Sequence, residues 1–193
     1  GERILGVALM PGDDLDALEE RLPSGCAFQG YLAFHDPIRP RVKSAIQRIS
    51  RAGVRTVIVT GDHPGTALAV ARTIGLSDGA GSVITGAELA ALAPDDILGR
   101  LPRVSVFARV TPEQKVMITR LFQSRGDVVA VTGDGVNDAP ALHRADIGVA
   151  VGSGTDVAKG ASDLVILDDN LETIVVAIEE GRRILDNVRK VIV

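Results

Sequence analysis

The sequence of 193 residues has one cysteine, no tryptophan and few aromatic residues of any kind. With Cys26 alone, no intrachain disulfide can form, and a reducing compartment is favoured. Aromatic residues make up 3% of the chain and the formal net charge is -4, so the sequence offers neither base-stacking platforms nor a basic surface for nucleic acid. It also has no apolar run of about 18 residues and no signal-peptide pattern, and we expect a chain that is soluble as given.

Hydrophobic residues nevertheless make up 46% of the chain, enough for one domain with a full core. Segments with helical spacing of apolar residues alternate with short β-branched runs, which predicts an α/β fold with a doubly wound, Rossmann-like parallel sheet. The expected helices cover 41–51, 64–74, one or two short segments within 76–100, and segments beginning at Thr111 and near Leu171, with a further short helix at 14–21; the expected strands cover 4–10, 30–35, 57–59, 83–84, 104–108, 128–131, 147–151 and 164–167.

The segment from Gly126 to Ala145 carries the strongest functional signal. Its apolar run from Val128 to Val131 is expected to be a buried strand that breaks at a Thr-Gly-Asp-Gly turn. Asp134 and Asp138 follow, with Asn137 between them, and Asp138 is placed to cap a helix with proline in its first turn. Carboxylates clustered at the carboxyl end of a strand are the expected ligands of a hard cation such as Mg2+.

Other polar residues are expected to face the same crevice, because the carboxyl ends of the strands in a doubly wound sheet lie together. The combination suits a phosphoryl group bound with Mg2+. Lys115 and the metal would neutralise charge on the phosphoryl oxygens, while the Thr60 hydroxyl and the Gly61 amide would hydrogen-bond them. The residues predicted at these strand ends are Asp36, Thr60, Arg109, Asp134 and Asp168.

Taken one at a time, several features also have a purely structural interpretation. Thr60-Gly61-Asp62 alone is a tight turn, and Lys115 alone is a solvated helix lysine. Asp36 and Arg39 are equally consistent with a surface ion pair. Three features are interpreted as structural: Gly152 to Thr155 as a turn and helix cap, Asp168 to Asn170 as the cap of the last helix, and His63 and His143 as surface residues.

Four motifs resemble, in the same order, those of the P-type cation-transporting ATPases. The longest, TGDGVNDAPAL from Thr132 to Leu142, looks like the hinge motif of that family and is highly specific. Three shorter ones support it: Asp36 to Arg39 resembles the DPPR box, Val59 to Asp62 the second TGD motif, and Ala108 to Lys115 the conserved lysine segment. The amino-acid sequence around residues 61–67 and 180–187 is more similar to that of the calcium and sodium/potassium pump branch than to that of the heavy-metal branch.

This resemblance implies a haloacid dehalogenase-like fold and a division of the chain. Residues 1–27 would end a nucleotide-binding domain, 28–182 would form the C-terminal part of the phosphorylation domain, and 183–193 would begin the stalk and fifth membrane helix. The chain would be a cytoplasmic part of an integral membrane protein, with ATP, the transported cation and the rest of the same polypeptide as partners. The implied roles are Mg2+ binding at Asp134 and Asp138, catalysis with Thr60, Gly61, Lys115, Asp134 and Asn137, and nucleotide binding near Asp36, Arg39, Asp62 and Arg109.

One motif of that family is absent. The DKTGT sequence, which holds the phosphorylated aspartate, does not occur in these 193 residues. We therefore predict that the sheet lacks its nucleophile-bearing strand unless another segment supplies it, and that the chain alone cannot form an aspartyl phosphate.

Three functional hypotheses remain. The leading one is a fragment of an ATP-driven cation pump that hydrolyses ATP through an aspartyl-phosphate intermediate. The second is a soluble phosphatase of the haloacid dehalogenase-like superfamily, which would need a D-x-D-x-T strand where the N-terminal region offers only Asp13-Asp14. The third is a non-catalytic module that binds Mg2+ or nucleotide.

Overall fold

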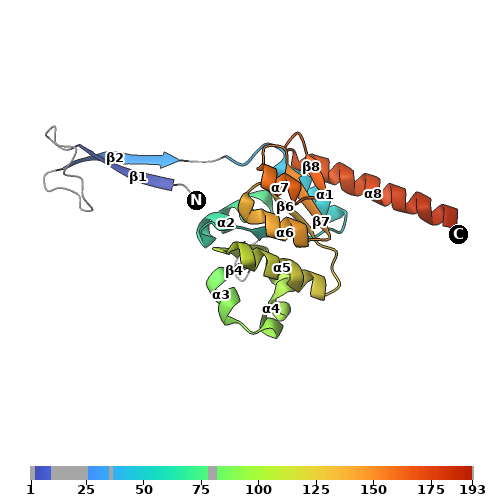
Figure 1. Ribbon diagram of the computed structural model, residues 1–193. Helices are drawn as coiled ribbons and strands as arrows, with labels where there is room; N and C mark the ends of the chain where they lie inside the picture. The colour runs from blue at the N-terminus through green and yellow to red at the C-terminus, as the bar shows by residue number, and fades with distance from the viewer. Residues whose placement is uncertain (1–2, 10–25, 35–36, 78–81, 193) are drawn as a thin grey trace. The chain divides into compact units, whose positions relative to one another are not determined.

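The computed structural model describes residues 3–9, 26–34, 37–77 and 82–192. The chain divides into two compact units, Gly1–Ile38 and Arg39–Val193 (Figure 1). The sequence-based boundary lay between residues 27 and 28. The structural division falls later in the chain because residues 27–34 pair along their whole length with the first strand. Two expectations, the short helix at 14–21 and the position of Asp36, lie outside the described residues.

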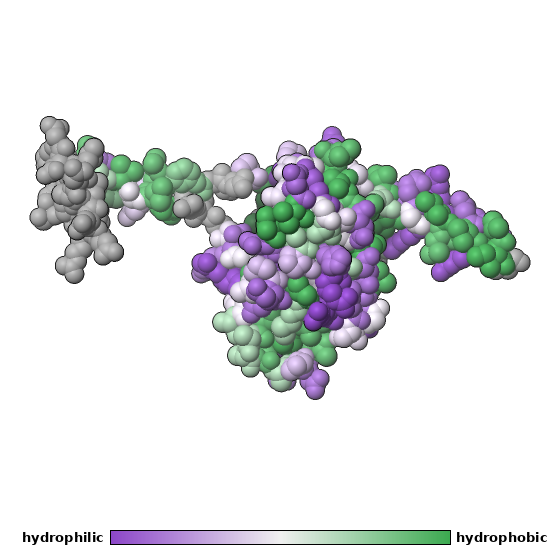
Figure 2. Space-filling model, viewed as in Figure 1, coloured by the Kyte–Doolittle hydropathy of each residue, from purple (hydrophilic) through white to green (hydrophobic). Residues whose placement is uncertain are grey.

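The first unit is an antiparallel hairpin. Strand β1 (Arg3–Leu9) pairs with β2 (Ala27–Phe34), with a register shift between Val7 and Ala8. Both strands were predicted, but they form their own sheet rather than joining a parallel one. Figure 2 shows the resulting apolar surface on this ribbon. Large exposed apolar side chains come from both strands: Ile4, Leu5, Val7, Leu9, Phe28, Tyr31, Leu32 and Phe34.

The second unit has the predicted α/β character, with two parallel sheets of three strands each. The first sheet has the order β3-β5-β4, formed by Ile58–Val59, Val106–Ala108 and Val83–Thr85. The second has the order β6-β7-β8, formed by Ala130–Gly133, Ile147–Val151 and Leu164–Ile166. Among the described strands, β3 and β6 are therefore both edge strands, and each leads into a Thr-Gly-Asp sequence at its carboxyl end.

The helices confirm the local signals in the sequence. Helix α5 (Pro112–Ser124) begins with a capping box, in which Thr111 and Gln114 satisfy each other's backbone amides. Helix α2 (Pro64–Ile74) ends at Gly75, whose φ of 82° lies in the left-handed region that favours glycine. The other helices are α1 (Val42–Arg51), α3 (Gly86–Ala91), α4 (Pro94–Arg100), η2 (Leu101–Arg103), η3 (Val136–Asp138), α6 (Ala139–Arg144), α7 (Asp156–Gly160) and α8 (Leu171–Ile192).

The largest buried cluster lies around the first parallel sheet. Phe107, on the central strand β5, is completely buried and packs with side chains of α3, α4 and α5. The segment 76–100, for which the sequence suggested no chemistry, thus supplies a covering layer of this core. A second, smaller cluster joins α6 and α7 to β7 through Leu142, Ala150 and Ala158. The two clusters fix the positions of α5 and α6, whose ends carry the polar residues described below.

The prediction that residues 128–131 form a buried strand was wrong in two respects. Strand β6 begins at Ala130, and the Val128 side chain before it is 80% exposed. Ala130 and Thr132 are exposed as well. The cause is the position of β6, which has β7 on one side and no strand on the other among the described residues. An apolar run is buried only where neighbouring elements cover it.

Helix α8 leaves the body of the second unit along its C-terminal half. Its first turns pack on α1, where Arg48 and Glu179 form a 2.9 Å ion pair and Val175 is buried. From Gly181 to Ile192 every residue is exposed, including Ile184, Leu185 and Val188. Within the described ranges, no helix combines the length and apolar character needed to cross a membrane.

Candidate functional site

The turn that follows β6 folds the Asp138 carboxylate back onto its own backbone. Oδ2 of Asp138 accepts hydrogen bonds from the amides of Gly135, at 3.1 Å, and Asp134, at 3.3 Å. Asp138 was predicted to cap α6 with its side chain, but it makes no such bond and instead closes the preceding turn η3. Gly133 allows this arrangement, because a Cβ at that position would lie 2.5 Å from the Asp138 Cβ.

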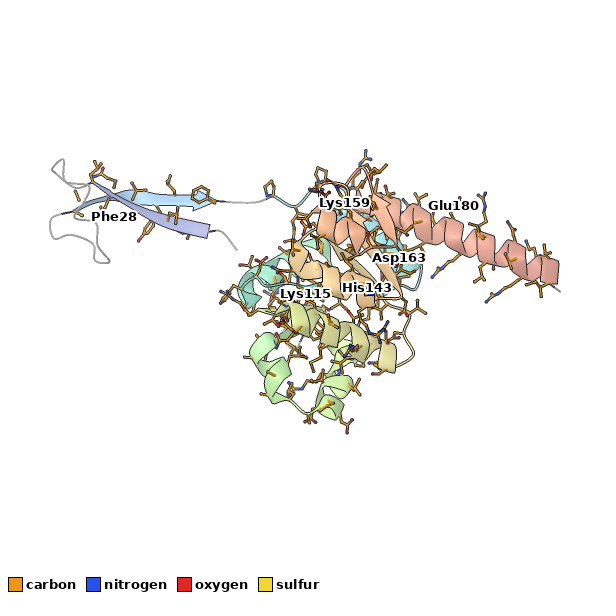
Figure 3. All side chains as sticks on the ribbon, in the orientation of Figure 1. Phe28, Lys115, His143, Lys159, Asp163 and Glu180 are labelled. Atoms are coloured by element: carbon orange, nitrogen blue, oxygen red, sulfur yellow. The ribbon has the colours of Figure 1, made fainter. Side chains whose placement is uncertain are left out.

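Lys115 holds the second oxygen of the same carboxylate. Its Nζ lies 2.6 Å from Asp138 Oδ1, and the two side chains are only 19% and 16% exposed. Helix α5 packs directly against α6, and the Lys115–Asp138 bond joins the first turn of α5 to the start of α6; Figure 3 labels Lys115 on α5 and His143 on α6. Lys115 is therefore a partly buried ion-pair partner and not a solvated helix lysine.

Burial alone would raise the pKa of Asp138, because it penalises the charged carboxylate. The Lys115 ammonium and the Gly135 and Asp134 amides outweigh burial, and the pKa of Asp138 lies below its ordinary value of 3.8. The carboxylate thus remains charged throughout the neutral and mildly acidic range, and the cation beside it is fixed there.

A pH-dependent contribution to stability follows from this depressed pKa. Asp138 should contribute about 1–2 kcal/mol to the free energy of unfolding. The contribution should be complete above the ordinary pKa of an aspartate and disappear as the pH falls through the lower pKa of the folded chain. Urea denaturation of the wild type and Asp138→Asn between pH 7 and pH 3 measures the difference.

The matched control for these urea denaturation measurements is Glu180→Gln, which removes the exposed ion pair of Glu180 with Arg183 in α8. It should change the free energy of unfolding by less than about 0.5 kcal/mol at any pH in this range. A wild-type advantage over Asp138→Asn that stays constant down to pH 3 would contradict the assigned role of the Lys115–Asp138 pair.

The second Thr-Gly-Asp turn lies at the end of β3, and it is bonded to the loop that leads into α5. The Asp62 amide donates to the Thr60 hydroxyl at 3.1 Å, which closes the turn locally. The Val110 amide donates to the Thr60 carbonyl at 3.2 Å, and the Arg109 amide to the Asp62 carbonyl at 3.1 Å. Arg109 has a φ of 55°, a strained value for a residue with a side chain. The fold therefore brings Thr60, Asp62 and Arg109 together and joins them through the chain to Lys115.

Gly86 and Gln114 support this loop through a contact with each other that no local sequence pattern indicates. A Cβ on Gly86 would lie 2.3 Å from the Arg109 carbonyl oxygen and 2.6 Å from Gln114 Oε1. Gln114 Nε2 donates to the Gly86 carbonyl at 2.7 Å, while its Oε1 accepts from the Thr111 amide at 3.0 Å. The capping box was visible as a local pattern, but the contact with Gly86 joins residues far apart in the sequence.

The remaining predicted residues have other partners. Arg39 Nη1 donates to the Asp169 carbonyl at 3.0 Å. Asn170 Oδ1 accepts a hydrogen bond from the Glu172 amide at 3.0 Å, which confirms that the cap of α8 lies within Asp168 to Asn170. Asp168 itself accepts from the Asn170 amide and the Thr173 hydroxyl. Thr155 caps α7 by accepting from the Ala158 amide, which confirms the turn-and-cap interpretation of that loop.

His63 and His143 are exposed as predicted, and Nδ1 of His63 additionally caps α2. Asn137 and Gly61 are also exposed.

The residues at the β6 turn fit a magnesium ion that is completed by ligands from outside the chain. The Asp134 carboxylate is exposed, and no hydrogen bond or ion pair with another described residue engages it. The described ranges contain no group of three or more metal-ligating side chains. Mg2+ is characteristically held by one or two carboxylates together with water and phosphate oxygens. Asp134 is free to serve as such a ligand, whereas Asp138 in this state is bound to Lys115.

Comparison with known proteins identifies relatives of this chain. A family model described as haloacid dehalogenase-like hydrolase matches residues 8–146, and a second model with the same description matches residues 116–178. The chain is 49% identical over 201 residues to the probable cation-transporting ATPase F of Mycobacterium bovis, and 48% identical over 195 residues to calcium-transporting ATPase 1 of Yarrowia lipolytica. These alignments cover 100% of the chain but only 22% and 21% of the two relatives.

Solved structures show the same fold. A zinc-transporting PIB-type ATPase in the E2.Pi state aligns with a TM-score of 0.67 and 28% identity, over 98% of this chain and 29% of the other. The catalytic domain of the CPx-ATPase CopB-B aligns with a TM-score of 0.55 over 79% of this chain and 48% of the other, at 22% identity. The similarity thus extends across nearly the whole sequence and corresponds to one part of much longer proteins.

Proposed function

Because the chain belongs to the haloacid dehalogenase-like hydrolase family, we propose that it is part of the phosphorylation domain of a P-type cation-transporting ATPase. The observation that carries the proposal is the partly buried Lys115–Asp138 ion pair beside the free Asp134 carboxylate at the end of β6. The parent protein would hydrolyse ATP through an aspartyl phosphate and couple this reaction to cation transport. The relatives named calcium-transporting ATPases favour a calcium pump-like branch.

In this proposal each residue of the candidate site has a definite role. The Lys115 ammonium, fixed by Asp138, would stabilise negative charge on the transferring phosphoryl oxygens. The Thr60 hydroxyl and the Gly61 amide would hydrogen-bond those oxygens, and Asn137 would orient them from the turn after β6. Asp134, with Asp138 beside it, would hold Mg2+, which when bound supplies Lewis-acid stabilisation of the phosphoryl group.

The nucleotide would lie near the loops that precede α1, α2 and α5. The cationic side chain of Arg109 is exposed, and its backbone is bonded to Asp62. We propose that Arg39, Asp62 and Arg109, together with Asp36, contact ATP. The bond from Arg39 to Asp169 leaves the guanidinium exposed and able to contact an anion as well.

Two edge strands support the proposal that another segment completes the sheet. Among the residues that the structure describes, strands β3 and β6 each pair with a neighbour on one side only, and both lead into the Thr-Gly-Asp turns. A strand that carried the DKTGT sequence between these edges would place its aspartate beside Thr60 and Asp134. The rest of the parent polypeptide would supply this strand, the missing part of the nucleotide-binding domain around β1 and β2, and the membrane helices that follow α8.

Phosphorylation by ATP tests the proposal. The isolated chain, incubated with ATP and Mg2+, is expected to form no acid-stable, hydroxylamine-sensitive phosphate, since it lacks the acceptor aspartate. The parent protein is expected to form one. An acyl phosphate on the isolated chain would contradict the assignment, and hydrolysis of small phosphate esters by the isolated chain would favour a soluble phosphatase.

A further inference from the structure

The loop between β7 and α7 lies directly on the backbone of Asp134. The Thr155 amide donates to the Asp134 carbonyl at 2.8 Å. Gly154 approaches so closely that a Cβ there would lie 3.0 Å from the Asp134 carbonyl oxygen and 3.2 Å from its Cα. Helix α7, which this loop begins, also contacts η3. The position of the loop therefore determines where the Asp134 peptide can lie.

Asp169 holds the other side of the same loop. Its Oδ1 accepts a hydrogen bond from the Ser153 amide at 3.0 Å. The hydrogen bonds from Ser153 hold the pKa of Asp169 below its ordinary value, and the carboxylate is accordingly charged when it accepts them. Asp169 has a φ of 50°, one of three positive values at non-glycine residues in the described ranges. Such a strained conformation persists only where surrounding contacts fix it.

Arg39 supplies one of those contacts. Its Nη1 donates to the Asp169 carbonyl at 3.0 Å, although the two residues are separated by 130 positions in the sequence. The guanidinium therefore fixes the backbone of Asp169, and the Asp169 carboxylate fixes the loop. A continuous series of hydrogen bonds and close contacts runs from Arg39 through Asp169 and Ser153 to Asp134.

We propose that Asp169 is a positioning residue for Asp134, which it orients through the backbone of the loop from Gly152 to Thr155. This inference rests on the proposed function, in which Asp134 is the principal Mg2+ ligand. Asp169 acts through the loop and is not assigned as a metal ligand. It fixes the Ser153 amide, the loop fixes the Asp134 carbonyl, and the Asp134 carboxylate would thereby be positioned for Mg2+. Besides its proposed contact with nucleotide, Arg39 fixes the backbone of Asp169 through its bond to the Asp169 carbonyl.

Three substitutions at one position separate the contributions of Asp169. Asp169→Asn keeps an oxygen acceptor and a residue that tolerates a positive φ. Asp169→Gly keeps the backbone conformation at low cost but removes the acceptor. Asp169→Ala removes the acceptor and also disfavours the positive φ. The matched control is Asp168→Asn, which changes the neighbouring carboxylate. Its bonds go to the Asn170 amide and the Thr173 hydroxyl and not to the loop.

Two measurements on the full chain are needed. The first is hydrogen exchange of the Thr155 amide without metal, which should be roughly tenfold faster in Asp169→Gly and Asp169→Ala than in the wild type and near wild type in Asp169→Asn. The second is a titration with Mg2+ alone, followed by the amide NMR signals of Gly133 to Gly135. The Kd for Mg2+ should rise roughly tenfold in Asp169→Gly, with rescue in Asp169→Asn and no change in Asp168→Asn.

The outcomes distinguish this inference from the proposed function. If the wild type does not bind Mg2+, the metal role of Asp134 fails, while the exchange rate of the Thr155 amide still decides whether Asp169 fixes the loop. If the wild type binds Mg2+ and Asp169→Gly binds it equally well, the positioning role is overturned. Unchanged Thr155 exchange in Asp169→Gly overturns it too. Because Asp169→Asn and Asp169→Gly preserve the backbone conformation, the test does not depend on whether Asp169→Ala folds.

Discussion

The Gly133→Ala substitution is expected to lower the free energy of unfolding by about 2–3 kcal/mol, the cost typical of overpacking a well-filled site. The added methyl group would lie 2.5 Å from the Asp138 Cβ and 2.8 Å from its Cγ. Asp138 cannot move away without losing the Gly135 and Asp134 amides and the Lys115 ammonium. The substitution therefore acts on the stability of the turn and on the ion pair together.

Gly135→Ala is the matched control, two positions further in the same turn. A Cβ there would lie 3.5 Å from Asp138 Oδ2, an ordinary van der Waals distance, and the residue has a φ of -103° that alanine adopts readily. It should cost less than about 1 kcal/mol. Urea denaturation at neutral pH compares the two variants, and equal losses would show that the close approach at Gly133 is not what constrains the turn.

Asp134→Asn should reduce phosphoenzyme formation in the parent protein by about 100-fold or more, the scale reached when one group that stabilises transition-state charge is removed. Its carboxylate is exposed and makes no hydrogen bond or ion pair with the part of the chain that the structure describes. The amide replacement should therefore leave the free energy of unfolding within about 0.5 kcal/mol of the wild type. A large loss of activity without a loss of stability identifies a functional carboxylate.

The measurement is the amount of hydroxylamine-sensitive phosphate formed with time at saturating ATP and Mg2+. Asp127→Asn is the control, because it removes the same charge from a surface position that lies 3.9 Å from Arg125. It should retain wild-type activity. Full activity in Asp134→Asn would remove Asp134 from the proposed magnesium site.

Asp138 is expected to behave differently from Asp134, although the two carboxylates belong to one motif. Asp138 accepts three hydrogen bonds, one of them from the Lys115 ammonium, and its replacement should reduce stability as well as activity. This contrast arises only from the tertiary structure, since the sequence predicted a metal-binding role for both residues. It also separates the two roles experimentally, because the stability of the isolated chain can be measured without any phosphoryl transfer.

The sequence was a sufficient guide wherever the deciding interactions lie within a few residues of one another. The capping box at Thr111 and Gln114, the turn at Thr60 and the cap formed by Asn170 are local hydrogen bonds, and all were visible as short patterns. Helix and strand positions followed from periodicity, and the α/β class followed from their alternation. The motifs also identified the family, because the segment from Thr132 to Leu142 is long and specific.

Only the tertiary structure determined which distant groups meet. It placed Lys115 on Asp138, Arg39 on Asp169 and the Thr155 amide on the Asp134 carbonyl. It also left Val128 exposed and paired β1 with β2 in a sheet of their own. The physical reason is that burial and long-range hydrogen bonds depend on which elements pack together, and an apolar run or a charged side chain has the same local pattern whether or not a partner covers it. The sequence therefore determined the elements and the chemical groups, and the packing of α5, α6 and the β7–α7 loop determined how those groups act on one another.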